Sequence, residues 1–104
     1  MIIRLWRGKT PRDKADEYEI ILRRTGLADY TSVDGLLAYY FTRNDRDTYT
    51  DFLLITHWDS IESIKEFAGD DYHKAKYYPE DHDFLLEFPE FVEHFQVFEH
   101  SDAT

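Results

Sequence analysis

Cysteine is absent from this sequence, and glycine is scarce at 4 residues. Without cysteine the chain can form no disulfide framework, no thiolate nucleophile and no cysteine-ligated zinc site. Neither a glycine-rich phosphate loop nor a nucleophile elbow is present. No apolar run approaches the roughly 20 residues that a membrane helix needs, and no secretory signal is visible. We therefore expect a soluble, cytoplasmic protein that makes no membrane contact.

Positive charge is also in short supply, with 12 Lys and Arg against 22 Asp and Glu and a net charge of -10. Proteins bind nucleic acid and anionic membranes through basic side chains, so neither is an expected partner. Aromatic residues are abundant at 17% of the chain. A small core does not readily hold so many rings, and we expect some of them to line a pocket or an interface.

The order of apolar patterns and turn signals predicts a single domain over residues 1–100, followed by a flexible tail over 101–104. Thr10 and Pro11 suit the start of a helix that Gly26 ends, and residues 59–62 have capping-box character. The expected elements are a strand over 2–9, a helix over 10–26, strands over 36–43 and 48–58, a helix over 61–68 ended by Gly69, and a last strand over 91–99. This is the βαββαβ order of an α+β ferredoxin-like fold with an antiparallel sheet.

Residues 70–87 fit this order least clearly. The stretch 71–78 is expected to continue as a helix until Pro79 breaks it. A second short helical piece is expected over 81–88. If 71–78 is helical, His73 and Tyr77 lie four residues apart and share one face of the helix.

Both faces of the predicted strands are apolar. In the second strand one face would carry Leu36, Ala38 and Tyr40, and the other Leu37, Tyr39 and Phe41. An antiparallel sheet with one solvated face should instead alternate between apolar and polar residues. Since the chain has no further element to cover the second face, a second copy is the simplest cover, and we expect a homodimer.

The sequence resembles the antibiotic biosynthesis monooxygenase family over nearly its whole length. The matching segments are Trp6-Arg7-Gly8, Gly26 to Tyr30, Gly35-Leu36-Leu37 and, most strongly, Thr56 to Ile64 with Phe67. The resemblance implies a dimeric α/β barrel made of two ferredoxin-like protomers. It also implies a cofactor-independent monooxygenase, an oxidoreductase acting on a small quinol-like or anthrone-like aromatic without metal, flavin or haem. The alternative is a non-catalytic dimeric barrel that binds a small hydrophobic molecule.

Such chemistry needs aromatic walls, a base and a group that stabilises an oxyanion. Trp58 and Phe67 could form the walls, and His73 or His57 could be the base. The predicted site therefore has His73 and Tyr77 as catalytic residues and Trp58, Phe67, Tyr72 and Arg7 as substrate-binding residues. All of these except Arg7 are expected to border one cavity between the sheet and the second helix region.

Each of these residues also has a purely structural explanation. Trp58 could be plain core, and His73 could be a solvated side chain. Arg7 could be a surface cation paired with a carboxylate. His57 alternates with Trp58, so the two should point to opposite faces of the strand. The consecutive residues Glu80 to Asp83 resemble metal ligands by type but not by spacing, so a solvated loop without metal is expected there.

The haem-degrading members of the same superfamily provide a further comparison. They use an asparagine on the first strand, a tryptophan at the end of the third strand and an iron-ligating histidine in the second helix region. Trp58 matches that tryptophan, but Arg7 with Trp6 before it replaces the asparagine. The ligand position falls near Lys76, whose charged amine cannot donate a lone pair to iron. A shift of one helical turn would place His73 there instead. We expect no haem cofactor.

Overall fold

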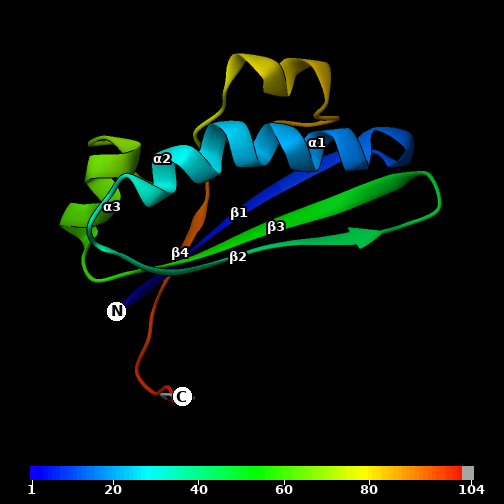
Figure 1. Cartoon of the computed structure of the whole chain (residues 1–104). Coiled ribbons are helices and arrows are strands. Elements are labelled where there is room, and N and C mark those ends of the chain that lie inside the picture. The colour runs from blue at the N-terminus through cyan, green and yellow to red at the C-terminus, as the bar shows by residue number, and fades with distance from the viewer. Residues whose placement is uncertain (102–104) are drawn as a thin grey trace.

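A computed structural model describes residues 1–101, so Asp102 to Thr104 of the predicted tail lie outside the described residues. The elements follow the order β1 (Ile2–Pro11), η1 (Arg12–Lys14), α1 (Ala15–Leu22), η2 (Arg23–Leu27), α2 (Ala28–Thr31), β2 (Leu36–Asp45), β3 (Tyr49–Trp58), α3 (Ile61–Ala68), η3 (Pro79–Asp83) and β4 (Glu93–Gln96) (Figure 1). Among the described residues, none of the helices is long and apolar enough to cross a membrane.

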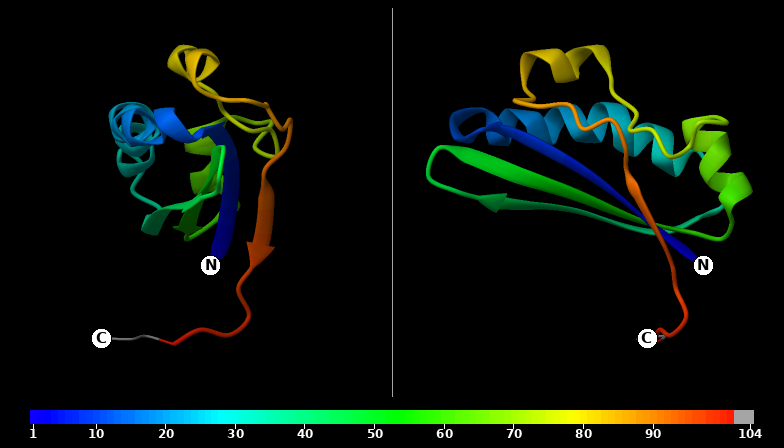
Figure 2. Two further views of the ribbon diagram at one scale, coloured as in Figure 1. Left: turned by 90° about the vertical axis from the view of Figure 1, so that its right-hand side faces the viewer. Right: turned by 180° about the vertical axis from the view of Figure 1, so that it is seen from behind.

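The four strands form one antiparallel sheet in the order β2-β3-β1-β4. β1 and β3 are paired along their whole length, from Ile2 opposite Trp58 to Pro11 opposite Tyr49. The helices lie on one side of the sheet, and no helix or strand of residues 1–101 covers the other side (Figure 2). The chain after β4 runs away from the body (Figure 2). This is the α+β ferredoxin-like fold that the sequence predicted.

The helix α3 forms where the sequence placed it. Ser60 caps it, with its side chain accepting a hydrogen bond from the Ser63 amide at 3.2 Å. Ile64 and Phe67 are buried against the sheet. The helix ends at Gly69, whose φ of 86° is open to glycine at little cost.

The first helix departs from the prediction at both ends. β1 continues through Pro11, so Thr10 is a buried strand residue and does not cap the helix. At the other end Gly26 does not stop the helix, because a π-helical turn, η2, carries the chain through Gly26 into α2. The helix does not end at this buried glycine, because the tertiary contacts of the helical layer outweigh the low helix propensity of glycine.

Residues 71–78 do not form the predicted helix. Lys74 instead forms an isolated bridge with Phe91. The Ala75 amide donates to the Glu90 carbonyl at 2.8 Å, and the His73 carbonyl accepts from the Val92 amide at 2.9 Å. The backbone of residues 73–75 thus pairs with that of residues 90–92. This pairing satisfies amide and carbonyl groups that a helix would have satisfied internally. The second helical piece is reduced to η3, and the last strand is shorter than predicted.

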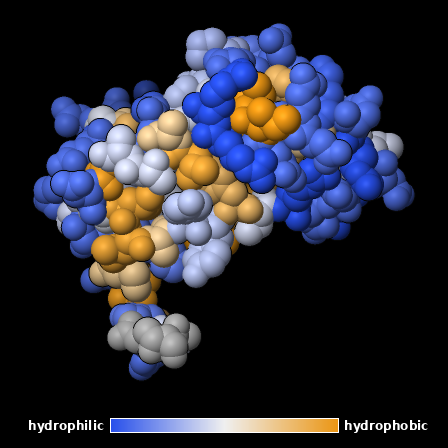
Figure 3. Space-filling view, viewed as in Figure 1, coloured by the Kyte–Doolittle hydropathy of each residue, from blue (hydrophilic) through white to orange (hydrophobic). Residues whose placement is uncertain are grey.

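A bulge in β2 changes the predicted division of its faces. The register shifts between Leu36 and Ala38, so Leu36 lies on the same face as Phe41, whereas the alternation had separated them. That face packs on the helices. On the open face Tyr40 and Phe95 are more than half exposed. In Figure 3 hydrophobic residues gather on the half of the molecule above the C-terminal extension, while the opposite end is mostly hydrophilic.

Candidate functional site

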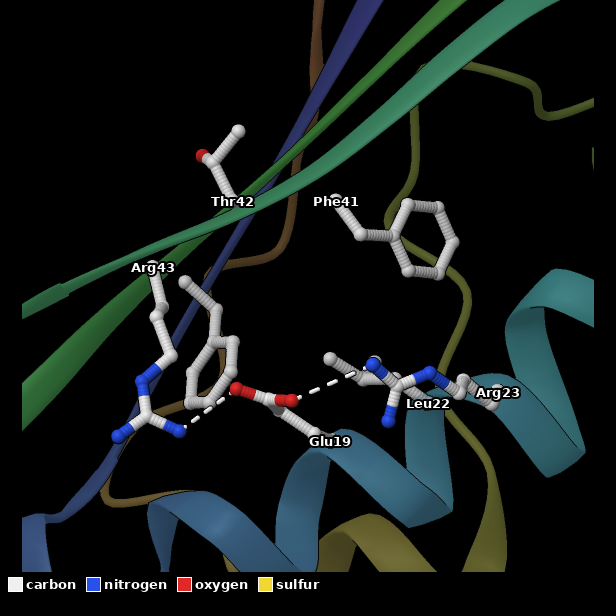
Figure 4. Close-up of a pocket in the computed structure, with 7 residues that line it drawn as sticks. Glu19, Leu22, Arg23, Phe41, Thr42 and Arg43 are labelled. Carbon is white, nitrogen blue, oxygen red and sulfur yellow. Dashed lines mark hydrogen bonds and ion pairs between the residues drawn. The ribbon is translucent and has the colours of Figure 1, made fainter.

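One hollow opens between α1 and β2 and has a cavity volume of about 90 Å³ (Figure 4). Leu22, Phe41 and Phe52 give it apolar walls. Glu19 crosses its opening and accepts hydrogen bonds from Arg43 at 2.7 Å and from Arg23 at 3.3 Å. Because these charges are already paired, the hollow offers no free group for catalysis.

A second, smaller cavity of about 10 Å³ lies deeper between the helical layer and β1 and β3. It has room for about one water molecule. Its lining is largely aromatic and includes Trp6, Tyr18, Tyr30, Phe67 and Tyr78, together with Lys76. The rings of Tyr30 and Phe67 are stacked with centroids 4.1 Å apart, and Trp58 packs on Phe67 at 6.0 Å. Aromatic walls of this kind suit a flat ring.

Arg4 lies beside this cavity and is completely buried, at 0% exposure. Its guanidinium donates to the Tyr30 hydroxyl at 3.2 Å and to the Lys74 carbonyl at 3.5 Å. The guanidinium carbon lies 5.3 Å from the ring centroid of Phe67. β1 places Arg4 here because alternate residues of that strand face the helices, and Arg4 shares this face with Trp6.

A second cation, Lys76, lies at the outer side of the cavity. Its amine donates to Asp29 at 3.3 Å and to the Phe67 carbonyl at 3.2 Å. Asp29 also accepts a hydrogen bond of 2.5 Å from the Tyr78 hydroxyl. That bond, followed by Lys76, lowers the pKa of Asp29, whereas burial raises the pKa of Tyr78. Asp29 is therefore an ionised carboxylate whose partners are the Tyr78 hydroxyl and the Lys76 amine.

His94 completes the group, because β4 pairs it directly opposite Arg4. Neither of its ring nitrogens has a hydrogen-bond partner. Burial, and then the charges of Arg4 and His73, lower the pKa of His94 to about 4. The imidazole is therefore neutral at pH 7. Tyr72 and His73 lie over it, with ring centroids 5.2 Å and 5.5 Å away.

The predicted site residues fall into separate places. Trp58 and Phe67 are together in the core, and Trp58 is fully buried with its indole N–H bonded to Thr56 at 2.8 Å. Tyr72 and His73 are neighbours, 4.2 Å apart, and His73 is exposed. Tyr77 instead packs on Trp6 at 6.0 Å and donates to the Pro89 carbonyl.

Two further candidates lie on the open face of the sheet. Arg7 is exposed there and pairs with Glu93 at 3.2 Å. His57 points away from Trp58, as predicted, and its ring lies 5.8 Å from Tyr40. The sequence analysis missed Arg4, His94 and Tyr30. The two-residue period of a strand could have identified Arg4. Arg4 is two residues from Trp6 and so shares its face, whereas Arg7 is one residue from Trp6 and lies on the opposite face.

The acidic run 80–83 is not simply a solvated loop. Asp81 is buried, accepts the Tyr18 hydroxyl at 2.9 Å and accepts the Tyr78 amide at 2.8 Å. Burial raises its pKa. No group of three or more potential metal ligands occurs among residues 1–101. Asp81 thus ties η3 to α1 and has a structural role.

The fold and this buried site define an α+β protein with a small, aromatic-lined cavity between its sheet and helices. The family model for antibiotic biosynthesis monooxygenase matches residues 1–76, and the chain belongs to that family. One similar structure is a mutant of MhuD with two manganese protoporphyrin IX molecules bound per active site, at TM-score 0.65 and 15% identity, covering 99% of this chain and 100% of that one.

A second similar structure is a Bacillus cereus protein assigned as an antibiotic biosynthesis monooxygenase. It matches at TM-score 0.61 and 13% identity over 96% of this chain and 97% of that one. No curated protein matches the chain. At these identities the two structures establish the fold and carry no residue roles.

Proposed function

We propose that this protein is a cofactor-independent monooxygenase that oxidises a small quinol-like or anthrone-like aromatic. The observation that carries the proposal is the buried site itself, in which an aromatic cavity adjoins an unpaired cation, Arg4, and a neutral imidazole, His94. Membership of the family supports the reaction class. Trp58 and Phe67 keep their predicted role as walls in this proposal.

The reaction needs only a base and a stabilised substrate anion. An activated CH₂ group, which an anthrone carries and a quinol carries in its keto tautomer, loses a proton, and the carbanion adds to O₂ to give a hydroperoxide once it is protonated. Loss of the second C–H proton then breaks the O–O bond and leaves a carbonyl group and water. The sum is CH₂ + O₂ → C=O + H₂O, in which four electrons pass from carbon to oxygen. Arg4 stabilises the anion, because a buried cation interacts strongly with negative charge that develops beside it.

His94 is the base in this proposal, since it is neutral at pH 7 and both nitrogens are unpartnered. A substrate anion beside Arg4 would raise the proton affinity of His94. His73 keeps a part in the proposal as the exposed residue beside the base, because the two rings lie 5.5 Å apart. The predicted catalytic role of Tyr77 stays a prediction.

The residues here do not suit haem. Lys76 is bonded to Asp29 and to the Phe67 carbonyl, and the stacked rings of Tyr30 and Phe67 fill the space that a macrocycle would need. His73 is not on a helix, so the shift by one helical turn that would have made it a ligand has no basis.

A second copy is proposed to cover the open face of the sheet and form the dimeric barrel. The exposed Tyr40 and Phe95 and the half-buried Ile55 support this proposal, because an apolar sheet face in water favours association. The helices occupy the other face (Figure 2), and Arg4 is a residue of that inner face, away from the proposed interface.

Oxygen uptake with hydroquinones and anthrone tests the function. We expect consumption of O₂ above the rate in buffer, and a fall in kcat of about 100-fold in His94→Asn. The exposed histidine in His82→Gln is the matched control, and its rate should equal that of the wild type. Binding of these compounds without O₂ uptake would favour the non-catalytic barrel instead.

A further inference from the structure

Arg4 is a buried charge without a counter-ion. It is 0% exposed, and both of its hydrogen-bond partners, the Tyr30 hydroxyl and the Lys74 carbonyl, are neutral. No ion pair among residues 1–101 includes it. Acidic residues are not lacking, since the chain has 22. A buried ion normally costs several kcal/mol unless a partner compensates it.

The unpartnered polar groups of the protein are concentrated around this charge. Among the described residues, the buried side-chain nitrogens and oxygens without a partner are Arg4 Nε, Trp6 Nε1 and the two ring nitrogens of His94. β1 and β4 place all three residues at adjacent positions on the inner face. Arg4 and Trp6 offer N–H donors, and no carboxylate accepts from them. Donors without acceptors are the complement of an anionic oxygen ligand.

Aromatic side chains and Lys76 lie between this group of donors and the surface. Phe67 and Tyr30, which contact Arg4, also line the cavity, and Lys76 lies at its outer side with a side chain that is 36% exposed. Because the cavity is about 10 Å³, a ring can enter only if the side chains that line it, Lys76 among them, move apart. The charge of Lys76 is already compensated by Asp29, 3.3 Å away, whereas no carboxylate is paired with Arg4.

We infer that the site takes an aromatic ligand that carries a carboxylate, bound by Arg4 behind Tyr30 and Phe67, two of the residues that line the cavity. This rests on the proposed function for the reaction and refines it for the substrate, which becomes a carboxylated quinol or a similar aromatic acid. The planar guanidinium fork matches a planar carboxylate in two parallel hydrogen bonds. A neutral quinol would leave the Arg4 charge as uncompensated as it is in the free protein.

Binding is measured without oxygen, using benzoate and its neutral isostere benzamide, by calorimetry on the wild-type protein at pH 7. We expect benzoate to bind about tenfold or more tightly than benzamide. Arg4→Met should abolish this preference, whereas Arg24→Met, which removes an exposed arginine outside the site, should retain it. Equal binding of the two probes by the wild type, or a preference that survives Arg4→Met, would overturn the inference.

A second measurement does not depend on the folding of Arg4→Met. The Arg4 Nε–H is buried and unpartnered, so its NMR signal should shift when benzoate binds and stay in place with benzamide. A signal that does not move with saturating benzoate would also overturn the inference.

Oxygen uptake is then compared between hydroquinone and its carboxylated form, gentisate. No uptake with either, together with selective benzoate binding, refutes the oxygenase and leaves the carboxylate site standing. Equal uptake with both supports the oxygenase and refutes the carboxylate site.

Discussion

At the scale of single residues, two ionisable groups next to each other on β1 and β4 set the character of the site. Arg4 remains charged because an arginine is not deprotonated in proteins. His94, directly opposite it, is kept neutral by burial and by that charge. The pair therefore combines a fixed positive charge with a proton acceptor, and neither group is neutralised by a carboxylate of the chain.

The neutral His94 makes stability depend on pH. Its pKa is about 4 in the folded protein, against about 6.5 in an unfolded chain. The unfolded state therefore binds the proton first, and stability present above about pH 6.5 is lost as the pH falls toward 4. We expect His94→Leu to flatten the fall in unfolding midpoint between pH 7 and pH 5, measured by urea denaturation. His82→Gln is the control for loss of an imidazole. An unchanged pH profile in His94→Leu would show that the pKa of His94 is the same in the folded and the unfolded chain.

At the scale of elements, the ring of Trp6 approaches the backbone of Gly8 closely within β1. A Cβ on Gly8 would lie 2.6 Å from the ring of Trp6, which folds back over it. Gly8→Ala should push that ring out of the cavity lining and cost about 1–3 kcal/mol in unfolding free energy. Gly26→Ala is the contrasting variant, since the nearest atom is 3.7 Å away and alanine favours a helix by up to about 1 kcal/mol. If both variants unfold at the same urea concentration, Trp6 is not confined as described.

The link between η3 and α1 gives a second prediction at this scale. Tyr18→Phe removes the 2.9 Å hydrogen bond to the buried Asp81 and leaves one carboxylate oxygen unpartnered. We expect a loss of about 1–3 kcal/mol in the free energy of unfolding, measured by urea denaturation. Tyr39→Phe removes a hydroxyl from a side chain that is 45% exposed and should have almost no effect. Equal stability of the two variants would show that the Tyr18–Asp81 bond is not needed to hold η3.

The elements also show what the sequence could predict. The apolar strand pattern and the capping-box character of residues 59–62 located β3 and α3, because both signals are local. Residues 71–78 were predicted wrongly, because their backbone partners, residues 90–92, are distant in sequence and leave no local pattern. For the same reason Trp58 and Phe67 were recognised as neighbours, while His94, brought to Arg4 only by sheet pairing, was not.

At the scale of the whole molecule, the open face of the sheet determines the predicted assembly. We expect sedimentation at micromolar concentration to give about twice the 12.5 kDa chain mass. Ile55 lies on β3 beside Tyr40 and Leu5 on that face, so Ile55→Lys would place a charge in the middle of the dimer interface and should give the monomer mass. Ile20→Lys is the matched control, because Ile20 is an apolar residue of α1 that is 58% exposed and lies on the helical layer. It should leave the dimer intact. A wild-type chain that sediments as a monomer would contradict the barrel. A dimer that persists in Ile55→Lys and dissociates in Ile20→Lys would show that the interface lies on the helices. An interface there would cover the approach to Lys76.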